Sequence, residues 1–440
     1  MAIIGISAQA QSYKESGGKK MPIQSRLSGS PDIESGLLKL IEQDWIKCLK
    51  GWWPDNLNHY LITKYQVDIT ARYAGQSIAN PFGKASGQLT MNVGQIRESA
   101  QAGLGFVVLK TLIAQNAMGH QSMSAWSIPE SKMQVEPITG QSGRSGWTIT
   151  WKGRGWSRSF EDYIQLCRDS FEISMETGLI VAPSVKFHLP ANLDEKWDIS
   201  EYDYTLNALA NAWQGAGGQS LLIVEKDFSP TLAGDQLAKQ EKLIERWLTE
   251  ITSVIRNATS EQLTLGIKLF NFVGDHEYQN EILRICLDDS CKPDFLVYAN
   301  RLFNPNKTFQ GVAGVAYGGP DLSDRNLAIL ARCRPETTQS NVEISGTGDI
   351  DSGRTAVEYG LLGCSSVQMH TIFQIPTDIP ASAGLSRTRK TLATLVFHPV
   401  HGLTGWLLHA RRHWGLCNES GLSKWMGLKD LKMQPLEAAD

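Results

Sequence analysis

The chain has 440 residues, 42% of them hydrophobic and 20% charged, and its 42 Lys and Arg against 45 Asp and Glu leave a formal charge of −3. This composition excludes a globally disordered chain, and the balanced charge excludes a general nucleic-acid coat or a polybasic membrane anchor. The seven Cys form no CxxC pair, which argues against a zinc ribbon or an iron–sulfur cluster. Because the start lacks a signal-peptide pattern and no apolar run reaches membrane-spanning length, we expect a cytoplasmic protein.

The N-terminal part of the chain divides into two segments. Residues 1 to 31 are rich in Ser, Gly, Gln and Lys without periodicity, which predicts a flexible leader. Residues 32 to 65 form a predicted helical extension, in which an amphipathic pattern over residues 32 to 53 ends at Pro54. Two interpretations of this helix stay open: it docks on the body of the protein, or it offers a peripheral surface to a membrane or a partner protein.

From residue 78 onward, short apolar runs alternate with helical patterns. The runs cover residues 78 to 87, 105 to 110, 179 to 188, 220 to 227, 263 to 270, 294 to 300, 341 to 349 and 365 to 371. Strands that alternate with helices predict a parallel sheet with right-handed crossovers, and eight of them favour a closed (β/α)8 barrel. We therefore expect an α/β protein with a TIM barrel over residues 66 to 375 and an amphipathic, Trp-rich helical extension over residues 376 to 440.

Polar residues gather where the predicted strands end, and the C-terminal ends of barrel strands are where such folds carry their chemistry. Lys110, Lys226 and Lys268 lie in apolar runs, and a lysine is costly to bury unless an anion or several acceptors meet it. Several such lysines at one rim of the barrel predict a bound anion or cofactor. The loop ISGTGDIDSGRTA places glycines and Ser352 ahead of a helix, which predicts a phosphate site or an ordinary turn between strand and helix.

A family resemblance rests on a set of motifs taken in order. NPFGKASG, VVLKT, a Ser-Pro turn after the fourth strand, IKL, an Asn at the sixth strand and GTGDIDSGRTAVEYGLLGCSSVQMHT resemble the dihydroorotate dehydrogenase (DHODH) family, including the related barrel domain of dihydropyrimidine dehydrogenase. The resemblance covers roughly residues 66 to 375. It implies a barrel that holds flavin mononucleotide (FMN) and transfers hydride between flavin N5 and a carbon–carbon bond next to a carbonyl or amide.

The resemblance also implies roles for individual residues. It implies cofactor contacts for Ala85, Ser86, Gly87, Lys110, Thr111, Lys268, Gly346, Gly348, Ser352, Gly353, His370 and Thr371. It implies substrate contacts for Lys110, Lys226, Thr231 and Asn300. Lys268 is implied beside flavin N1, where a fixed ammonium stabilises the anionic reduced flavin. Ser229 stands at the position of the catalytic base and needs a relay to act as one; an ordinary Ser-Pro turn is the alternative.

Departures from the family pattern concern the substrate and the phosphate loop. Lys226 and Thr231 replace two Asn, and Asp349 stands where a second Gly is common. The loop after the second strand lacks the Asn-Ser-Met-Gly pattern that grips orotate. Instead, it interleaves Arg and Trp residues, namely Arg144, Trp147, Trp151, Arg154, Trp156 and Arg158. This pattern indicates either a clamp for a flat or anionic substrate, or a β-hairpin that packs its Trp side chains on the barrel.

The predicted function is therefore an FMN-dependent oxidoreductase acting on CH–CH groups, with a heterocyclic or amide-containing small-molecule substrate other than orotate. A genuine dihydroorotate dehydrogenase and a non-catalytic barrel that serves as an interaction scaffold are the alternatives. We expect no nucleic-acid partner, a homodimer as the commonest assembly, and no metal site, because Pro399 interrupts the HxxH pattern of His398 and His401.

Overall fold

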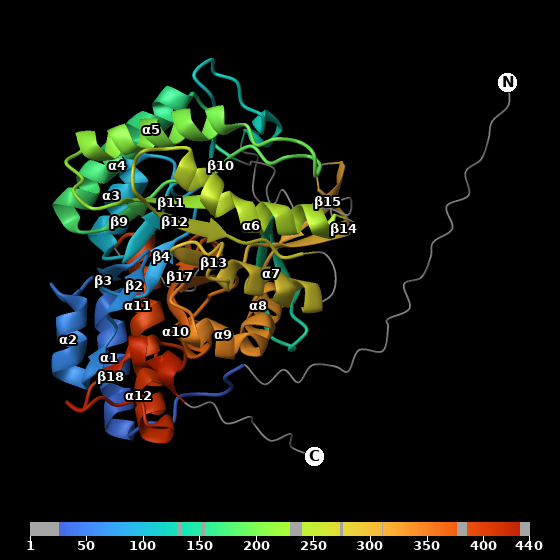
Figure 1. Ribbon diagram of the computed structural model, residues 1–440. Helices are drawn as coiled ribbons and strands as arrows, with labels where there is room; N and C mark the ends of the chain where they lie inside the picture. Colours follow the sequence, from blue (N-terminus) through green and yellow to red (C-terminus); the bar gives the residue numbers. More distant parts are fainter. Residues whose placement is uncertain are drawn as a thin grey trace.

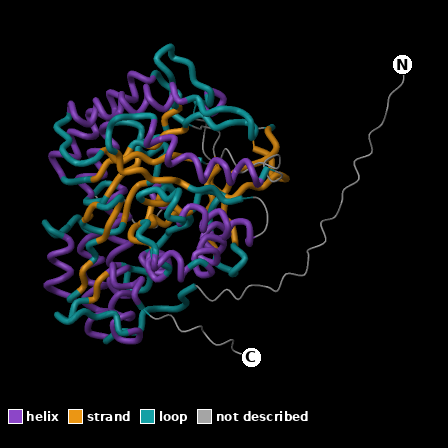
Figure 2. The backbone as a smooth tube through the Cα atoms, viewed as in Figure 1, coloured by secondary structure: helices purple, strands orange, loops and turns teal. Residues whose placement is uncertain are grey.

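A computed structural model describes residues 26 to 129, 134 to 150, 155 to 228, 240 to 272, 276 to 309, 311 to 375 and 385 to 431. Within these ranges, ten short strands pair in parallel to form one curled sheet, which helices surround (Figures 1 and 2). The strands are β4 (Phe82–Lys84), β5 (Phe106–Val108), β6 (Leu112–Ile113), β9 (Ile180–Ala182), β10 (Ser184–Lys186), β11 (Leu222–Asp227), β12 (Leu263–Lys268), β13 (Phe295–Tyr298), β16 (Glu343–Thr347) and β17 (Cys364–Met369).

Nine of the ten strands fall on the eight predicted apolar runs, because the third run contributes both β9 and β10, which Pro183 separates. The tenth strand, β6, begins two residues after the end of the second run, which contains β5. The two segments pair twice, β5 with β9 and β6 with β10. Pairing then continues from β10 through β11, β12, β13, β16 and β17 to β4, which pairs with β5. The sheet is therefore closed, and the predicted (β/α)8 barrel is confirmed.

The helices that follow the barrel strands are amphipathic and pack on its outside. They are α3 (Val93–Ala102), α4 (Phe160–Thr177), α5 (Ile199–Gly215), α6 (Glu241–Asn257), α7 (His276–Leu287), α8 (Pro320–Arg332), α9 (Arg334–Gln339), α10 (Gly353–Leu361) and α11 (Arg387–Phe397). In α6, Leu243, Trp247 and Ile251 recur every four residues on the buried face. Polar caps fix several helix starts; for example, the Asn92 side chain accepts a hydrogen bond from the Gln95 amide at the start of α3.

Helices from both ends of the chain lie together beside the barrel (Figure 1). They are α1 (Ser35–Leu49), α2 (Leu57–Tyr65) and α12 (Leu403–Trp414), and β1 (Val67–Asp68) pairs with β18 (Ser423–Lys424) next to the short helix η3 (Trp425–Asp430). Helix α1 packs on α11 and α12. Its apolar surface is not fully covered, because Leu40 and Ile46 remain 39% and 40% exposed. Among the described residues, no helix is both long and apolar enough to cross a membrane.

The N-terminal end of the barrel is closed by a small hairpin of β2 (Ala71–Tyr73) and β3 (Gln76–Ile78), which contacts β16 and β17. The Tyr73 ring stacks on Phe106 with 3.9 Å between centroids, and it meets the Phe295 ring edge-on at 5.2 Å. Gly266 allows this packing, because a Cβ there would lie 2.1 Å from the Phe295 ring. With one end plugged by aromatic rings, a ligand reaches the interior from the opposite mouth.

Candidate functional site

A cavity of about 890 Å³ occupies the C-terminal mouth of the barrel. Its volume lies in the range typical of small-molecule and cofactor sites. Residues in or just after β4, β5, β10, β11, β12, β13, β16 and β17 line it, so its wall consists of the ends of strands on every side of the barrel. This is the position at which TIM barrels carry their active sites.

Positive charge dominates one part of the cavity wall. Lys110, Lys268 and Arg301 line it together with the imidazole of His370. The pKa of His370 is lowered to about 3, first by burial and then by the charges of Arg301, Lys110 and Lys268. Burial also lowers the pKa of Arg301 to about 9. The Nε2 atom of His370 accepts a hydrogen bond from the backbone N–H of Gln88 at 3.2 Å, which requires an unprotonated Nε2. The ring is therefore neutral, beside positive charges that attract anions.

A carboxylate with a chain of hydroxyls lies elsewhere on the wall. Thr111 Oγ1 donates to Asp227 Oδ2 at 3.2 Å and lies 2.9 Å from Ser86 Oγ and 3.0 Å from Ser184 Oγ. Lys186 Nζ lies 3.5 Å from the same Asp227 oxygen. All but Ser184 of these residues line the cavity. Ser86 is therefore connected to a buried ion pair through one hydroxyl.

Two antiparallel hairpins cover the mouth. The first joins β7 (Gln134–Thr139) to β8 (Ser145–Thr150), and the second joins β14 (Leu302–Phe309) to β15 (Val312–Tyr317). They contact each other, since Lys307 pairs with Glu136 and the Gly318 amide donates to Thr148 Oγ1. Trp147 and Phe309 line the cavity from these hairpins. The cavity thus has a charged wall and a partly aromatic roof.

The loop predicted to hold phosphate divides between the cavity and the surrounding packing. Gly348 lines the cavity, whereas Gly346, Ser352 and Gly353 are not among the lining residues. Ser352 caps α10 by accepting a hydrogen bond from the Thr355 amide at 3.2 Å. A Cβ on Gly353 would lie 2.1 Å from the backbone nitrogen of Leu403, so this glycine permits close packing of two segments. The first turn of α10 is therefore engaged by the protein itself.

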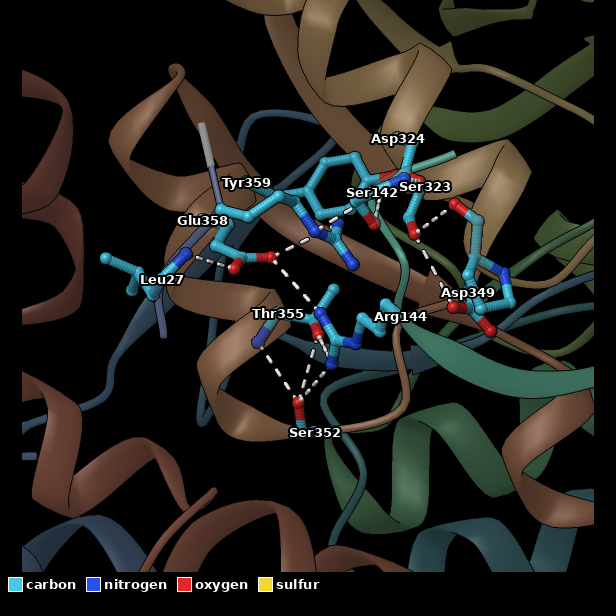
Figure 3. A network of polar contacts seen from close by, with 12 residues as sticks. Leu27, Ser142, Arg144, Ser323, Asp324, Asp349, Ser352, Thr355, Glu358 and Tyr359 are labelled. Atoms are coloured by element: carbon cyan, nitrogen blue, oxygen red, sulfur yellow. Dashed lines mark hydrogen bonds and ion pairs between the residues drawn. The ribbon is translucent and has the colours of Figure 1, made fainter. Parts of the chain in front are cut away.

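An ion-pair network locks the first hairpin to this same loop (Figure 3). Arg144, in the turn between β7 and β8, donates to Asp351 Oδ1 at 2.7 Å and to Thr355 Oγ1 at 2.8 Å. Arg26 reaches the same region and pairs with Glu358 at 3.3 Å. Burial and the neighbouring Asp351 raise the pKa of Asp349 well above its usual range. Arg144 thus fastens the roof to α10 and does not itself line the cavity.

The structure brings most of the sequence-predicted residues together. Those that line the cavity are Ala85, Ser86, Gly87, Lys110, Thr111, Lys268, Asn300, Gly348, His370 and Thr371. Lys226 is fully buried but is not a lining residue; its Nζ donates to the Asp227 carbonyl at 3.3 Å and lies over the Phe228 ring. Ser229 and Thr231 lie outside the described residues, as do Trp151 and Arg154 of the Arg/Trp loop.

Several lining residues were not among those assigned from the sequence: Asp227, Arg301, Gln368 and the residues of the second hairpin. Asp227 adjoins Lys226 in the same strand, and Arg301 follows Asn300 directly. The charged EKD sequence at the end of an apolar strand is the signal that points to Asp227. For the β14–β15 hairpin, the polar sequence LFNPNKTF offers no comparable signal.

One group outside the cavity has side chains of the kind that bind metals. One ligand atom each from His120, Asp198 and Glu201 lie within 4.8 Å of one another. The two carboxylates already have other contacts, since Asp198 accepts from the Ser200 amide and Glu201 from the Ser122 hydroxyl. Asp198 is the N-cap of α5 and Glu201 lies in its first turn, so both have a structural role. The absence of a metal site stays a prediction.

Comparisons with known proteins add little to this geometry. No protein-family profile matches the chain, and no curated protein matches it by sequence. Among solved structures, the chain is similar to the DHODH of Eimeria tenella in complex with ferulenol, with 12% sequence identity and a TM-score of 0.47 over 80% of this chain and 89% of that chain. The barrel is identified by its own strand pairing.

Proposed function

We propose that the protein is an FMN-dependent oxidoreductase of the dihydroorotate dehydrogenase type, acting on a CH–CH bond next to a carbonyl or amide in a small molecule other than orotate. The observation that carries the proposal is the cluster of Lys110, Lys268 and Arg301 at the mouth of a closed barrel, whose charges add to the effect of burial in keeping His370 neutral. Several cations on one wall of a cavity favour an anionic or strongly accepting ligand. The family resemblance of the sequence motifs supplies the identity of that ligand.

The residues present fit FMN. One wall of the cavity is formed by Ala85, Ser86 and Gly87. The backbone of this wall lies close to His370, since a Cβ on Gly87 would lie 2.2 Å from His370 Nε2. On the phosphate side, Gly348 and the hydroxyl of Thr371 line the cavity and are donors suited to a phosphate. Bound FMN supplies the hydride acceptor. Lys268 offers the fixed positive charge that favours the reduced flavin.

The roof and the wall support a substrate other than orotate. The β7–β8 hairpin takes the place of the loop that grips orotate in the family, and it presents Trp147 to the cavity. Asn300 and Arg301 offer donors to carbonyl oxygens, and Asp227 offers an acceptor to an N–H group. A cyclic amide or ureide presents both kinds of group.

The hydroxyl chain gives a proton a defined path. A proton that reaches Ser86 Oγ can pass over 2.9 Å to Thr111 and over 3.2 Å to Asp227, whose charge Lys186 balances. Ser229 is proposed as the group that takes the proton from the substrate, and this chain of hydroxyls is a candidate for the relay that a serine base needs.

The decisive experiment is the absorbance spectrum of the purified protein, followed by release of the bound chromophore. We expect a flavin spectrum and FMN in the supernatant after denaturation. Lys268→Met should weaken FMN binding or slow flavin reduction. Lys84→Met is the matched control, because Lys84 is equally buried but bonds to Glu98 and Ser99 outside the cavity. A colourless protein that binds no added FMN would contradict the proposal and favour a scaffold.

A second measurement separates the two enzyme alternatives. Saturating dihydroorotate is mixed anaerobically with the flavoprotein, and the flavin absorbance is followed. Unchanged absorbance is the expected result, and bleaching would identify a genuine dihydroorotate dehydrogenase. Saturated cyclic amides, for which dihydrouracil is the first probe, then test the proposed substrate class.

A further inference from the structure

A column of polar side chains crosses the core of the barrel directly beneath the cavity. At its centre lies Glu225 of β11, which is fully buried. Its Oε1 accepts a hydrogen bond from Tyr73 Oη at 2.7 Å and another from Gln368 Nε2. Tyr73 belongs to the plug at the closed end, whereas Gln368 lines the cavity. Glu225 is thus linked to the cavity floor through a single side chain.

The strand register places Glu225 in the layer below Lys268. In the β11–β12 pair, Glu225 stands opposite Gly266 and Asp227 stands opposite Lys268. Residues two apart in a strand share a face, so Gly266 and Lys268 face the same way, as do Glu225 and Asp227. The contacts of Glu225 with Gln368, on the distant strand β17, show that this face is the barrel interior. Glu225 and Lys268 therefore occupy successive interior layers, with Lys268 nearer the cavity.

One oxygen of Glu225 has no hydrogen-bond partner among the described residues. This atom is Oε2, and Oε1 of Gln368 is in the same situation. A buried carboxylate oxygen without a hydrogen-bond partner is costly, so its presence calls for a physical explanation. The charged and titratable groups that face it are Lys268 from β12, Asp227 from its own strand, Tyr73 from β2 and Tyr163 from α4. Burial raises the pKa of Glu225, and the positive charge of Lys268 opposes that rise.

We propose that Glu225 is a positioning residue that holds Gln368 at the cavity floor and, through its charge beside Lys268, sets the reduction potential of the flavin bound above. This inference rests on the proposed function. A negative charge in the layer below Lys268 offsets part of the positive charge that favours reduced, anionic flavin. Ionised Glu225 therefore lowers the potential, and neutral Glu225 leaves the full effect of Lys268 in place.

The test is the midpoint potential of the bound flavin, measured by equilibration with a reference dye from pH 6 to pH 9. Glu225→Gln keeps the size of the side chain and an oxygen acceptor for Tyr73, but removes the charge. We expect this variant to raise the potential at the alkaline end by about 30 mV, which is a tenfold change in the ratio of reduced to oxidised flavin for a two-electron couple. The difference should shrink at any pH at which wild-type Glu225 takes up a proton, because both proteins are then uncharged at this position.

Two further variants keep the test decisive. Glu343→Gln removes the charge of another carboxylate on a barrel strand, which pairs with Arg72 and does not line the cavity. This variant should keep the flavin midpoint potential at the wild-type value. Tyr73→Phe removes a donor that favours the charged form of Glu225, and it should shift the potential upward even if Glu225→Gln fails to fold. Equal potentials in wild type and variants at every pH would overturn the inference alone. A protein that binds no flavin would overturn the proposed function with it.

Discussion

Acid is expected to destabilise this protein through His370. Its pKa in the folded state is about 3, against an ordinary value of 6.5. Because the unfolded chain takes up the proton more readily, the stability contributed by neutral His370 is fully present above pH 6.5 and is lost progressively as the pH falls toward 3. Between pH 7.5 and pH 5.0 the free energy of unfolding should fall by about 2 kcal/mol. The fall occurs over the roughly 1.5 pH units between 6.5 and 5.0, at about 1.4 kcal/mol per unit.

The assay is urea unfolding of wild type and His370→Gln at both pH values. The variant has no titrating ring, so its free energy of unfolding should fall by about 2 kcal/mol less than that of wild type. His398 and His401, whose pKa values are also lowered by burial, are present in both proteins and cancel in the comparison. His59→Gln, which removes an exposed imidazole, should behave as wild type. If the free energy of unfolding fell equally in wild type and His370→Gln, the lowered pKa of His370 in the cavity would be refuted.

Three further predictions concern the roof, the wall and Ser229, the proposed base. Arg144→Ala leaves Asp351 without its ion-pair partner and Glu358 with Arg26 alone, and should lower the free energy of unfolding by about 3 kcal/mol. Arg158→Ala, at an exposed guanidinium over Trp156, should change it little. Gly87→Ala places a Cβ 2.2 Å from His370 Nε2, so it should cost about 1–3 kcal/mol in thermal unfolding and weaken FMN binding; an unchanged melting temperature would show that the wall yields. Ser229→Ala should slow flavin reduction in stopped-flow mixing while FMN stays bound, and wild-type kinetics would remove this serine from the mechanism.

The barrel could be predicted from the sequence because its strands are continuous apolar runs. A strand buried on both faces has such a run, and eight of them separated by helical patterns leave few topologies. The β14–β15 hairpin has no such signal, because its pairing is supported by contacts with another hairpin, such as Lys307 with Glu136. The position of this hairpin over the mouth depends on tertiary contacts, which local sequence patterns do not reveal.

The limits of the site prediction come from the direction of side chains. The sequence pattern places Lys226 in the site because it is a charged residue in an apolar strand, but alternate residues of a strand face opposite sides. Since Glu225 and Asp227 both make contacts inside the barrel, Lys226 lies on the other side. To decide which of two adjacent residues faces the barrel interior, one must know the register of the strand to within one residue. Similarly, the resemblance implies a cofactor contact for Gly353, whereas the close approach that this glycine allows is to the backbone of Leu403.

The polar column in the barrel core also bears on how the chain folds. Its hydrogen bonds join Tyr73 to Glu225, 152 residues away, and Glu225 to Gln368, 143 residues farther along. No half of the barrel contains all three side chains, so the column forms only when the first and last strands have come together. Contacts of such sequence separation slow folding but make it cooperative. A truncated barrel would expose a buried carboxylate, and we therefore expect the barrel to unfold as one unit, with no stable half.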